Sequence, residues 1–150
     1  MQIIRDSREK KGYWVFAGKR CKVQGLKTGD YTLKGFEDVL CIERKKTVME
    51  IAGNFTHKSG AFWREVDRMA EFPHAYLILE FTQDELLGYP WKSDIPKFLK
   101  RKIRIRGGYL ATKLEIIEER GIKVIFAGDR DGAIAIAERI FEEFQDEHSV

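Results

Sequence analysis

The stretch Val39-Leu40-Cys41-Ile42-Glu43-Arg44-Lys45 decides the fold, because four apolar residues run directly into three charged ones. A short apolar run that follows a turn, here residues 35–38, is typical of a strand buried inside a sheet. Glu43 and Lys45 stand two residues apart at the end of this strand, so their side chains are expected on the same face. The sequence therefore predicts a charged site at the end of a buried strand.

Shorter strands are predicted before this one, at residues 2–5, 22–26 and 31–34, and we expect them to be antiparallel. Helical spacing follows, since Phe62, Val66, Met69 and Ala70 form one stripe that Pro73 ends. The remaining predicted elements are a buried strand at 75–81, a short basic helix at 93–102 capped by Ser93 or Asp94, a helix marked by Leu110, Leu114 and Ile117, a buried strand at 122–126, and a last helix that Asp129 caps and that carries Ile136, Ile140 and Phe144 on one stripe. This order predicts an α/β fold, a mixed sheet with helices on both faces.

Composition limits the class of protein. With 150 residues, 43% of them hydrophobic and 34% charged, the chain is expected to form one domain and not a disordered or disulfide-framed protein. No apolar run approaches the ~18 residues that a membrane span needs. Cys21 and Cys41 are predicted to be small core residues of a cytoplasmic protein, and three widely separated histidines do not predict a zinc site.

The charge is unevenly distributed. Seven basic residues and two acids lie between Arg5 and Lys22, and seven basic residues and one acid lie between Lys92 and Arg106. The stretch from Glu138 to Glu147 carries five acids and one arginine. Each cluster is compatible with a solvated surface, but two basic clusters in one small domain also suit a phosphate backbone.

Asp30 opens the strand that precedes the buried one, and a short turn joins the two strands. Such a hairpin brings Asp30 and Glu43 within reach of one cation, and hard divalent ions such as Mg²⁺ prefer carboxylate oxygens and water. Lys45 is then placed to polarise an attacking water and to neutralise charge on a phosphodiester. The alternative is that Glu43 and Lys45 form an ordinary surface salt bridge.

These residues carry a resemblance. Gly29-Asp30-Tyr31, then Ile42-Glu43-Arg44-Lys45, with Asp6-Ser7-Arg8-Glu9 upstream, resemble the nuclease domain of the XPF-type structure-specific endonucleases. The resemblance continues through Gly53-Asn54-Phe55, the helix at 62–69 and the strand at 75–81. It implies a restriction-endonuclease-like fold over residues 1–145, followed by a polar tail at 146–150.

The resemblance implies roles for individual residues. Asp30 and Glu43 would be ligands of Mg²⁺, which Mn²⁺ would replace, and Lys45 would be the catalytic lysine. Arg44 would contact phosphate or anchor the site. Asp6 would be a further acid at the metal site, and Arg8 and Glu9 would face phosphate or support the site. Independently of the resemblance, the second basic cluster predicts Lys100, Arg101 and Lys102 as DNA-binding residues.

One position departs from the family pattern. Counting forward from Glu43, the family's last acid would stand at Met49, whereas the acid here is Glu50. Counting back from Gly53 puts Glu50 in register, so we expect Glu50 to be a metal ligand with one residue added after Lys45.

The implied function is a magnesium-dependent DNA endonuclease that cuts flaps, forks or other branched DNA in repair or recombination, in a prokaryotic or viral setting. Many members of the family append helix-hairpin-helix DNA-binding modules, and residues 146–150 do not contain one. We therefore expect branch selectivity to come from the basic clusters, from a partner protein or from a homodimer built on the last helix. The alternatives are a non-catalytic DNA-binding or scaffold subunit, and a resolvase or restriction-type enzyme that shares only the core fold.

Overall fold

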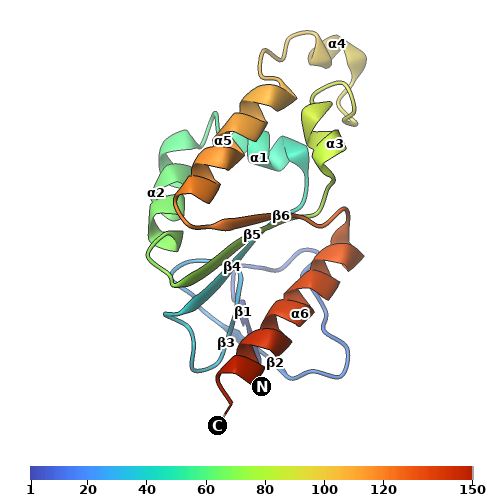
Figure 1. Cartoon of the computed structure of the whole chain (residues 1–150). Coiled ribbons are helices and arrows are strands. Elements are labelled where there is room, and N and C mark those ends of the chain that lie inside the picture. Colours follow the sequence, from blue (N-terminus) through green and yellow to red (C-terminus); the bar gives the residue numbers. More distant parts are fainter. Residues whose placement is uncertain (150) are drawn as a thin grey trace.

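A computed structural model describes residues 1–149 as a six-stranded mixed sheet with helices on both faces, as predicted (Figure 1). The strand order is β2-β1-β3-β4-β5-β6. The strands are β1 (Ile3–Asp6), β2 (Cys21–Gln24), β3 (Tyr31–Leu33), β4 (Leu40–Lys45), β5 (His74–Leu79) and β6 (Lys123–Phe126). All six residues of β4 are buried, which confirms the central strand expected at residues 39–45.

Strand directions match the sequence pattern except at one edge. β4, β5 and β6 are parallel to one another, and β3 is antiparallel to both β1 and β4. The prediction of antiparallel strands was wrong for β2, which runs parallel to β1. The connection between them is long and buries Trp14 and Phe16 on one face of the sheet, so the chain re-enters the sheet in its original direction.

Four helices cover one face of the sheet, α1 (Val48–Asn54), α2 (Ser59–Met69), α3 (Gln83–Leu87) and α5 (Gly107–Glu119), with the four-residue α4 (Lys97–Lys100) at the outer end (Figure 1). The predicted stripe of α2 is confirmed at Phe62, Val66 and Met69, which are buried against β4 and β5. Ala70 caps the helix and is exposed.

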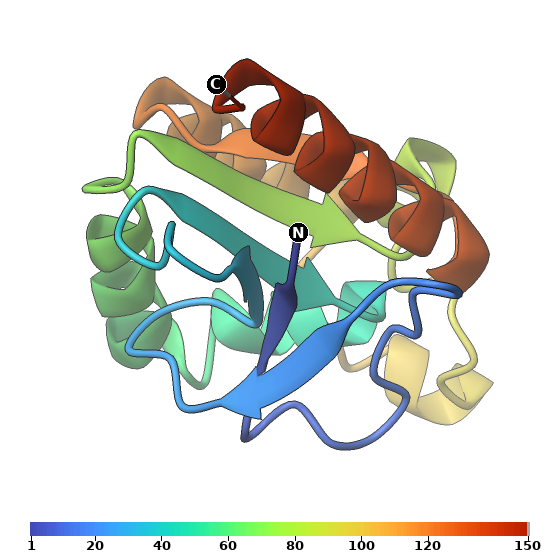
Figure 2. The same ribbon diagram turned by 90° about the horizontal axis from the view of Figure 1, so that it is seen from below.

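The opposite face is covered by α6 (Arg130–Glu147), which lies over the strands when the molecule is viewed from below (Figure 2). Asp129 caps this helix as predicted, because its side chain accepts a hydrogen bond from the Gly132 N–H. The buried stripe consists of Ala133, Ala137, Phe141 and Phe144. Ile136 and Ile140 flank it and are half-buried, so the predicted stripe was correct only at Phe144.

Three smaller expectations need correction. The basic helix is shorter than predicted and begins after Pro96, not after Ser93 or Asp94. β2 and β6 form the two edges of the sheet, and Cys21 and much of β6 are therefore less buried than expected. Helix α6 continues to Glu147, so the first two residues of the expected tail at 146–150 are helical, and Val150 lies outside the described residues.

Candidate active site

Asp30 is held directly beside Glu43 by the backbone of β4. The Asp30 N–H donates to the Ile42 carbonyl at 2.8 Å, and the Arg44 N–H donates to the Asp30 carboxylate at 2.8 Å. Asp30 is thus fixed to the residues on both sides of Glu43. The preceding Gly29 permits this approach, since it has a φ of +86° and a Cβ there would lie 2.6 Å from the Cys41 sulfur.

Glu43 and Lys45 point to the face of the sheet that α1 and α2 cover. Cys41, two residues before Glu43, is buried in the core on that face, whereas Ile42 is buried in the core under α6. The Lys45 ammonium lies 5.2 Å from the centre of the Phe62 ring on α2. The predicted same-face arrangement of the acid and the lysine is therefore present.

A third carboxylate reaches this site from α2. Glu65 lines the same cavity, of about 200 Å³, as Asp30 and Glu43. Its helix position, three residues after the buried Phe62, places it at the edge of the face that meets the sheet. Glu65 was not predicted as a site residue, and this spacing is the only feature of the sequence that indicates its position beside the sheet. The other residues that line the cavity are Asp6, Arg8, Glu9, Lys27, Thr28, Gly29 and Arg68.

The crowded carboxylates resist ionisation. Burial raises the pKa of Glu43 well above its ordinary value, and the negative charge of Asp30 and the neighbouring Glu65 raise it further. Burial also raises the pKa of Asp30. Three contacts lower this pKa, but by less: the hydrogen bond with Glu43, the hydrogen bond from the Arg44 N–H and the charge of Lys45. A positive charge placed between Asp30 and Glu43 would relieve this repulsion.

Asp6 and Arg8 form one wall of the cavity. The buried Asp6 carboxylate accepts from the Leu26 N–H at 2.8 Å and from Arg8 Nε at 2.9 Å. Most of the Arg8 side chain remains exposed, at 72%, which leaves the guanidinium accessible at the cavity rim. The structure thus brings Asp6 and Arg8 to the same cavity as Asp30 and Glu43.

Arg44 anchors the opposite side of β4. Its guanidinium is 2% exposed and pairs with Glu80 and, at 3.2 Å, with Glu9. Trp14 donates from its indole nitrogen to Glu80 at 2.7 Å and lies under the guanidinium. Of the two roles expected for Arg44, this arrangement supports anchoring, because both of its partners are protein carboxylates. Glu80 was not predicted as a site residue.

Glu50 lies apart from this cavity. It is exposed on α1, where its carboxylate accepts from the Lys46 N–H at 2.8 Å and its own N–H donates to the capping Thr47. Met49, at the alternative register, is also exposed. Glu50 therefore caps α1 in the structure, and its role as a metal ligand stays a prediction.

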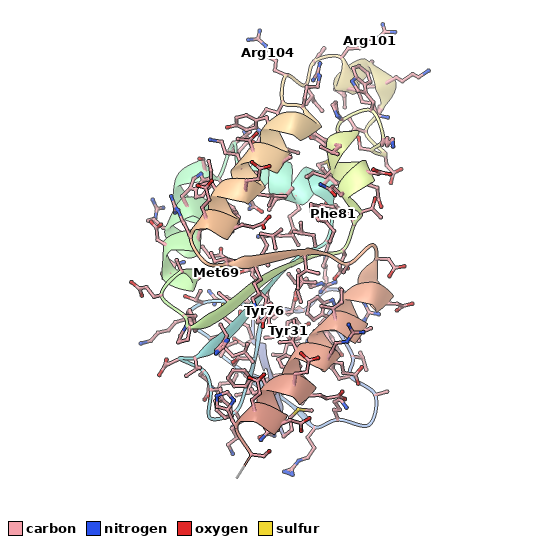
Figure 3. All side chains as sticks on the ribbon, viewed as in Figure 1. Tyr31, Met69, Tyr76, Phe81, Arg101 and Arg104 are labelled. Carbon is pink, nitrogen blue, oxygen red and sulfur yellow. The ribbon has the colours of Figure 1, made fainter. Side chains whose placement is uncertain are left out.

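The predicted DNA-binding residues Lys100, Arg101 and Lys102 also lie outside the cavity. They belong to the end of α4 and the residues after it, at the outer end of the molecule (Figure 3). Within residues 1–149, no three His, Cys, Asp or Glu side chains are arranged closely enough to hold a metal ion by themselves. No helix among those residues is long and apolar enough to cross a membrane.

Comparison of the sequence with family models and with curated proteins gives no match. Solved structures do match. XPF from Aeropyrum pernix superposes with a TM-score of 0.65 and 19% identity, over 93% of this chain and 59% of that one. XPF from Aeropyrum pernix in complex with DNA superposes with a TM-score of 0.68 and 19% identity, over 99% of this chain and 67% of that one. The chain has the fold of the part of XPF that it matches. The XPF fold extends over nearly all of this chain, which spans about three-fifths to two-thirds of the length of the XPF chains.

Proposed function

We propose that this chain is a magnesium-dependent DNA endonuclease. The observation that carries the proposal is the fixed pair Asp30 and Glu43, with Lys45 on the same face and Arg8 at the rim of the same cavity. Two carboxylates can hold a metal ion, and a lysine and an exposed arginine can stabilise the charge that develops when a phosphodiester is hydrolysed. The fold shared with XPF supports the proposal.

The donor set fits a magnesium ion. Asp30 and Glu43 offer only oxygen atoms, and both pKa values are raised, so the pair gains by neutralisation. Mg²⁺ is commonly held by one or two protein carboxylates, with water and substrate phosphate completing its coordination. A pair of acids without a third is therefore sufficient, and Glu65 lies in the same cavity to bind a metal-bound water or the ion itself.

Each side chain has a defined part in the proposed reaction. A bound Mg²⁺ would act as a Lewis acid on the phosphoryl oxygen and would increase the acidity of the attacking water. Lys45 orients that water and offsets the negative charge that develops on the phosphorus oxygens. Arg8, whose guanidinium is fixed by Asp6 and by the Leu26 carbonyl at 2.6 Å, holds a neighbouring phosphate. Cleavage leaves a 3′-hydroxyl and a 5′-phosphate.

Branched DNA is the proposed substrate, and a homodimer the proposed active form. Cations are concentrated at both the cavity rim and the outer end of the molecule, so the protein can hold two DNA segments at once. Ile136 and Ile140 on α6 pack against the core but are only half-buried, so their exposed parts are the proposed contact with a second copy. Phe144 is buried against the sheet and does not serve there.

A non-catalytic DNA-binding subunit is the second candidate. Two observations favour it. Counted forward from Glu43, the position of the family's last acid is Met49, which is exposed and cannot bind a metal through oxygen. Within residues 1–149, no three metal-ligating side chains come close enough together to hold an ion. The grouping of Asp30, Glu43 and Lys45 on one face of the sheet would then have no use, which makes this the weaker proposal.

One assay separates the two candidates. The purified chain is incubated with end-labelled flap, fork, four-way-junction and blunt duplex DNA in Mg²⁺, in Mn²⁺ and in EDTA. We expect 5′-phosphorylated products from the branched DNAs in Mg²⁺ or Mn²⁺ and none in EDTA. Binding to all four DNAs with no metal-dependent product on any of them would replace the endonuclease by the scaffold subunit.

A further inference from the structure

Residues 90–106, called here the basic spur, leave the body of the protein and return to it at one point. The Gly107 N–H donates to the Tyr89 carbonyl at 3.1 Å and closes the base of the spur. Gly107 also lies too close to the Leu86 and Leu87 carbonyls for any Cβ, so the closure is tight. Figure 1 shows α4, which lies within the spur, at the outer end of the molecule beyond α3 and α5.

The isoleucines of the spur are half-buried, whereas its aromatic side chains are exposed. Ile95, Ile103 and Ile105 pack against the core beneath α1 and α3. Trp91 is 53% exposed and Phe98 on α4 is 67% exposed, although both have larger apolar surfaces than isoleucine. Exposed aromatic rings that lie close together in one segment are available for contact with another molecule.

Cations surround these aromatic rings. The spur carries seven basic residues and one acid between Lys92 and Arg106. The Arg106 guanidinium lies 5.6 Å from the centre of the Trp91 ring, and the Lys100 ammonium donates to the Trp91 carbonyl at 3.0 Å. Figure 3 shows Arg101 and Arg104 pointing outward from the same end of the molecule.

We propose that the basic spur binds unpaired DNA, with Trp91 and Phe98 stacking on bases and the surrounding lysines and arginines contacting phosphates. This inference rests on the proposed function and adds the part of the substrate that the spur recognises, a single-stranded arm. Base faces stack on aromatic rings in any sequence, and such sites combine rings with a positive surface. Paired bases in an intact duplex do not present those faces.

The same features fit an anionic membrane less well. Helices that lie in a membrane surface present a continuous apolar face along many turns. Helix α4 has four residues, of which Phe98 and Leu99 are apolar and Lys97 and Lys100 are charged, and Trp91 lies outside it. A polyanion with exposed flat rings matches both the charge and the two isolated aromatic side chains.

The first test measures binding without cleavage, in EDTA, by fluorescence anisotropy. The probes are an oligo-dT of about 16 nucleotides, the upper end of common single-strand site sizes, and a blunt duplex of mixed sequence. Trp91→Ala and Phe98→Ala are each expected to weaken oligo-dT binding about 5- to 100-fold, and duplex binding less than about twofold. Tyr13→Ala is the matched control, because Tyr13 is also an exposed ring beside an arginine, Arg5, outside the spur.

The second test detects stacking directly. Trp14 is 1% exposed and Trp63 is half-buried, so Trp91 is the tryptophan that DNA reaches most easily. Oligo-dT is expected to quench the intrinsic tryptophan fluorescence of the wild type. Trp91→Phe is expected to lose this quenching and to keep oligo-dT affinity within about threefold, since phenylalanine also stacks.

Three results would overturn the inference. One is an equal loss of oligo-dT and duplex binding in Trp91→Ala, and another is quenching that persists in Trp91→Phe. The third is tighter binding to equimolar phosphatidylserine–phosphatidylcholine vesicles than to oligo-dT. Because these measurements are made without metal, their outcome is independent of cleavage. A wild-type protein that stacks on oligo-dT but cuts no DNA would refute the proposed endonuclease activity and support the proposed DNA binding by the spur.

Discussion

The carboxylate of Asp30 accepts a hydrogen bond from the backbone N–H of Arg44 at 2.8 Å, and this contact fixes the first acid of the site across the strand that carries the second. The position of Asp30 is therefore set by main-chain atoms and does not depend on a bound ligand. A preformed pair of this kind would require little rearrangement to bind the proposed metal and phosphate.

Asp30→Asn, Glu43→Gln and Lys45→Ala are each expected to reduce cleavage of a flap DNA at least a hundredfold, because each removes a group that acts on the phosphate in the proposed reaction. A hundredfold loss corresponds to about 2.7 kcal/mol of transition-state stabilisation. Single-turnover cleavage in Mg²⁺ measures the loss. DNA binding in EDTA is expected to stay at or above the wild-type affinity for the two carboxylate variants, which lose a negative charge.

The lysine variant differs from the other two in metal affinity. Lys45→Ala is expected to bind Mn²⁺, measured by electron paramagnetic resonance, as the wild type does, because an ammonium is not a ligand. Wild-type cleavage rates in both Asp30→Asn and Glu43→Gln would exclude this pair from catalysis.

Glu65→Gln and Glu50→Gln distinguish a cavity acid from a helix cap. Glu65 shares the cavity with Glu43, so Glu65→Gln is expected to weaken Mn²⁺ binding and to reduce cleavage more than tenfold. Glu50 accepts from the Lys46 N–H on α1, so Glu50→Gln is expected to change cleavage less than tenfold and stability by about 1 kcal/mol or less. A loss in Glu50→Gln that equals the loss in Asp30→Asn would instead make Glu50 a ligand, with α1 repositioned when metal binds.

Glu43→Gln is expected to make the protein more stable at neutral pH. Burial holds the pKa of Glu43 well above its ordinary value, and the charge of Asp30 raises it further. A raised folded-state pKa contributes stability that is complete below the ordinary value, about 4.3, and is lost as pH rises toward the folded value. The gain in melting temperature for Glu43→Gln over the wild type should therefore grow as the pH is raised from about 4.3.

Thermal unfolding followed by circular dichroism measures this gain, which amounts to about 2–4 °C for each kcal/mol in a chain of this size. Glu118→Gln, an exposed glutamate on α5, is the matched control and should change little. Added Mg²⁺ should stabilise the wild type more than it stabilises Glu43→Gln. A destabilised Glu43→Gln at pH 7 would contradict the proposed repulsion between the two acids.

Arg44→Gln is expected to destabilise the protein by about 3–5 kcal/mol, because it leaves the Glu9 and Glu80 carboxylates without their buried partner. Arg120→Gln is the comparison, since Arg120 and its partner Asp67 are 39% and 67% exposed and loss of this pair should cost about 1 kcal/mol or less. Urea unfolding measures both. A fully stable Arg44→Gln that had lost cleavage would assign Arg44 to the substrate phosphate and not to the anchor.

The parts of the site that are contiguous in the chain could be predicted from the sequence. Glu43 and Lys45 share a face because a strand alternates, and the Gly29–Asp30 turn places Asp30 beside them. Glu65 and Glu80 could not be predicted, since their roles depend on how α2 and β5 pack on β4. The direction of β2 was predicted wrongly for the same reason. It depends on how the segment with Trp14 and Phe16 packs on the sheet, and the alternation of residues within a strand gives no information on such packing.

The predicted DNA-binding residues Lys100, Arg101 and Lys102 are at the outer end of the molecule and not at the cavity. Their replacement is therefore expected to change the affinity for DNA without changing the cleavage step. Phosphate contacts add affinity without reading sequence, so replacing all three by Gln should weaken binding to every DNA alike. Each lost duplex contact should reduce the slope of log affinity against log salt by about 0.9. Cleavage of saturating flap DNA should stay near the wild-type rate, because the groups at Asp30 and Glu43 are untouched. Titrations of duplex DNA at several salt concentrations measure the slope, and a slope equal to that of the wild type would return these three residues to an ordinary solvated surface.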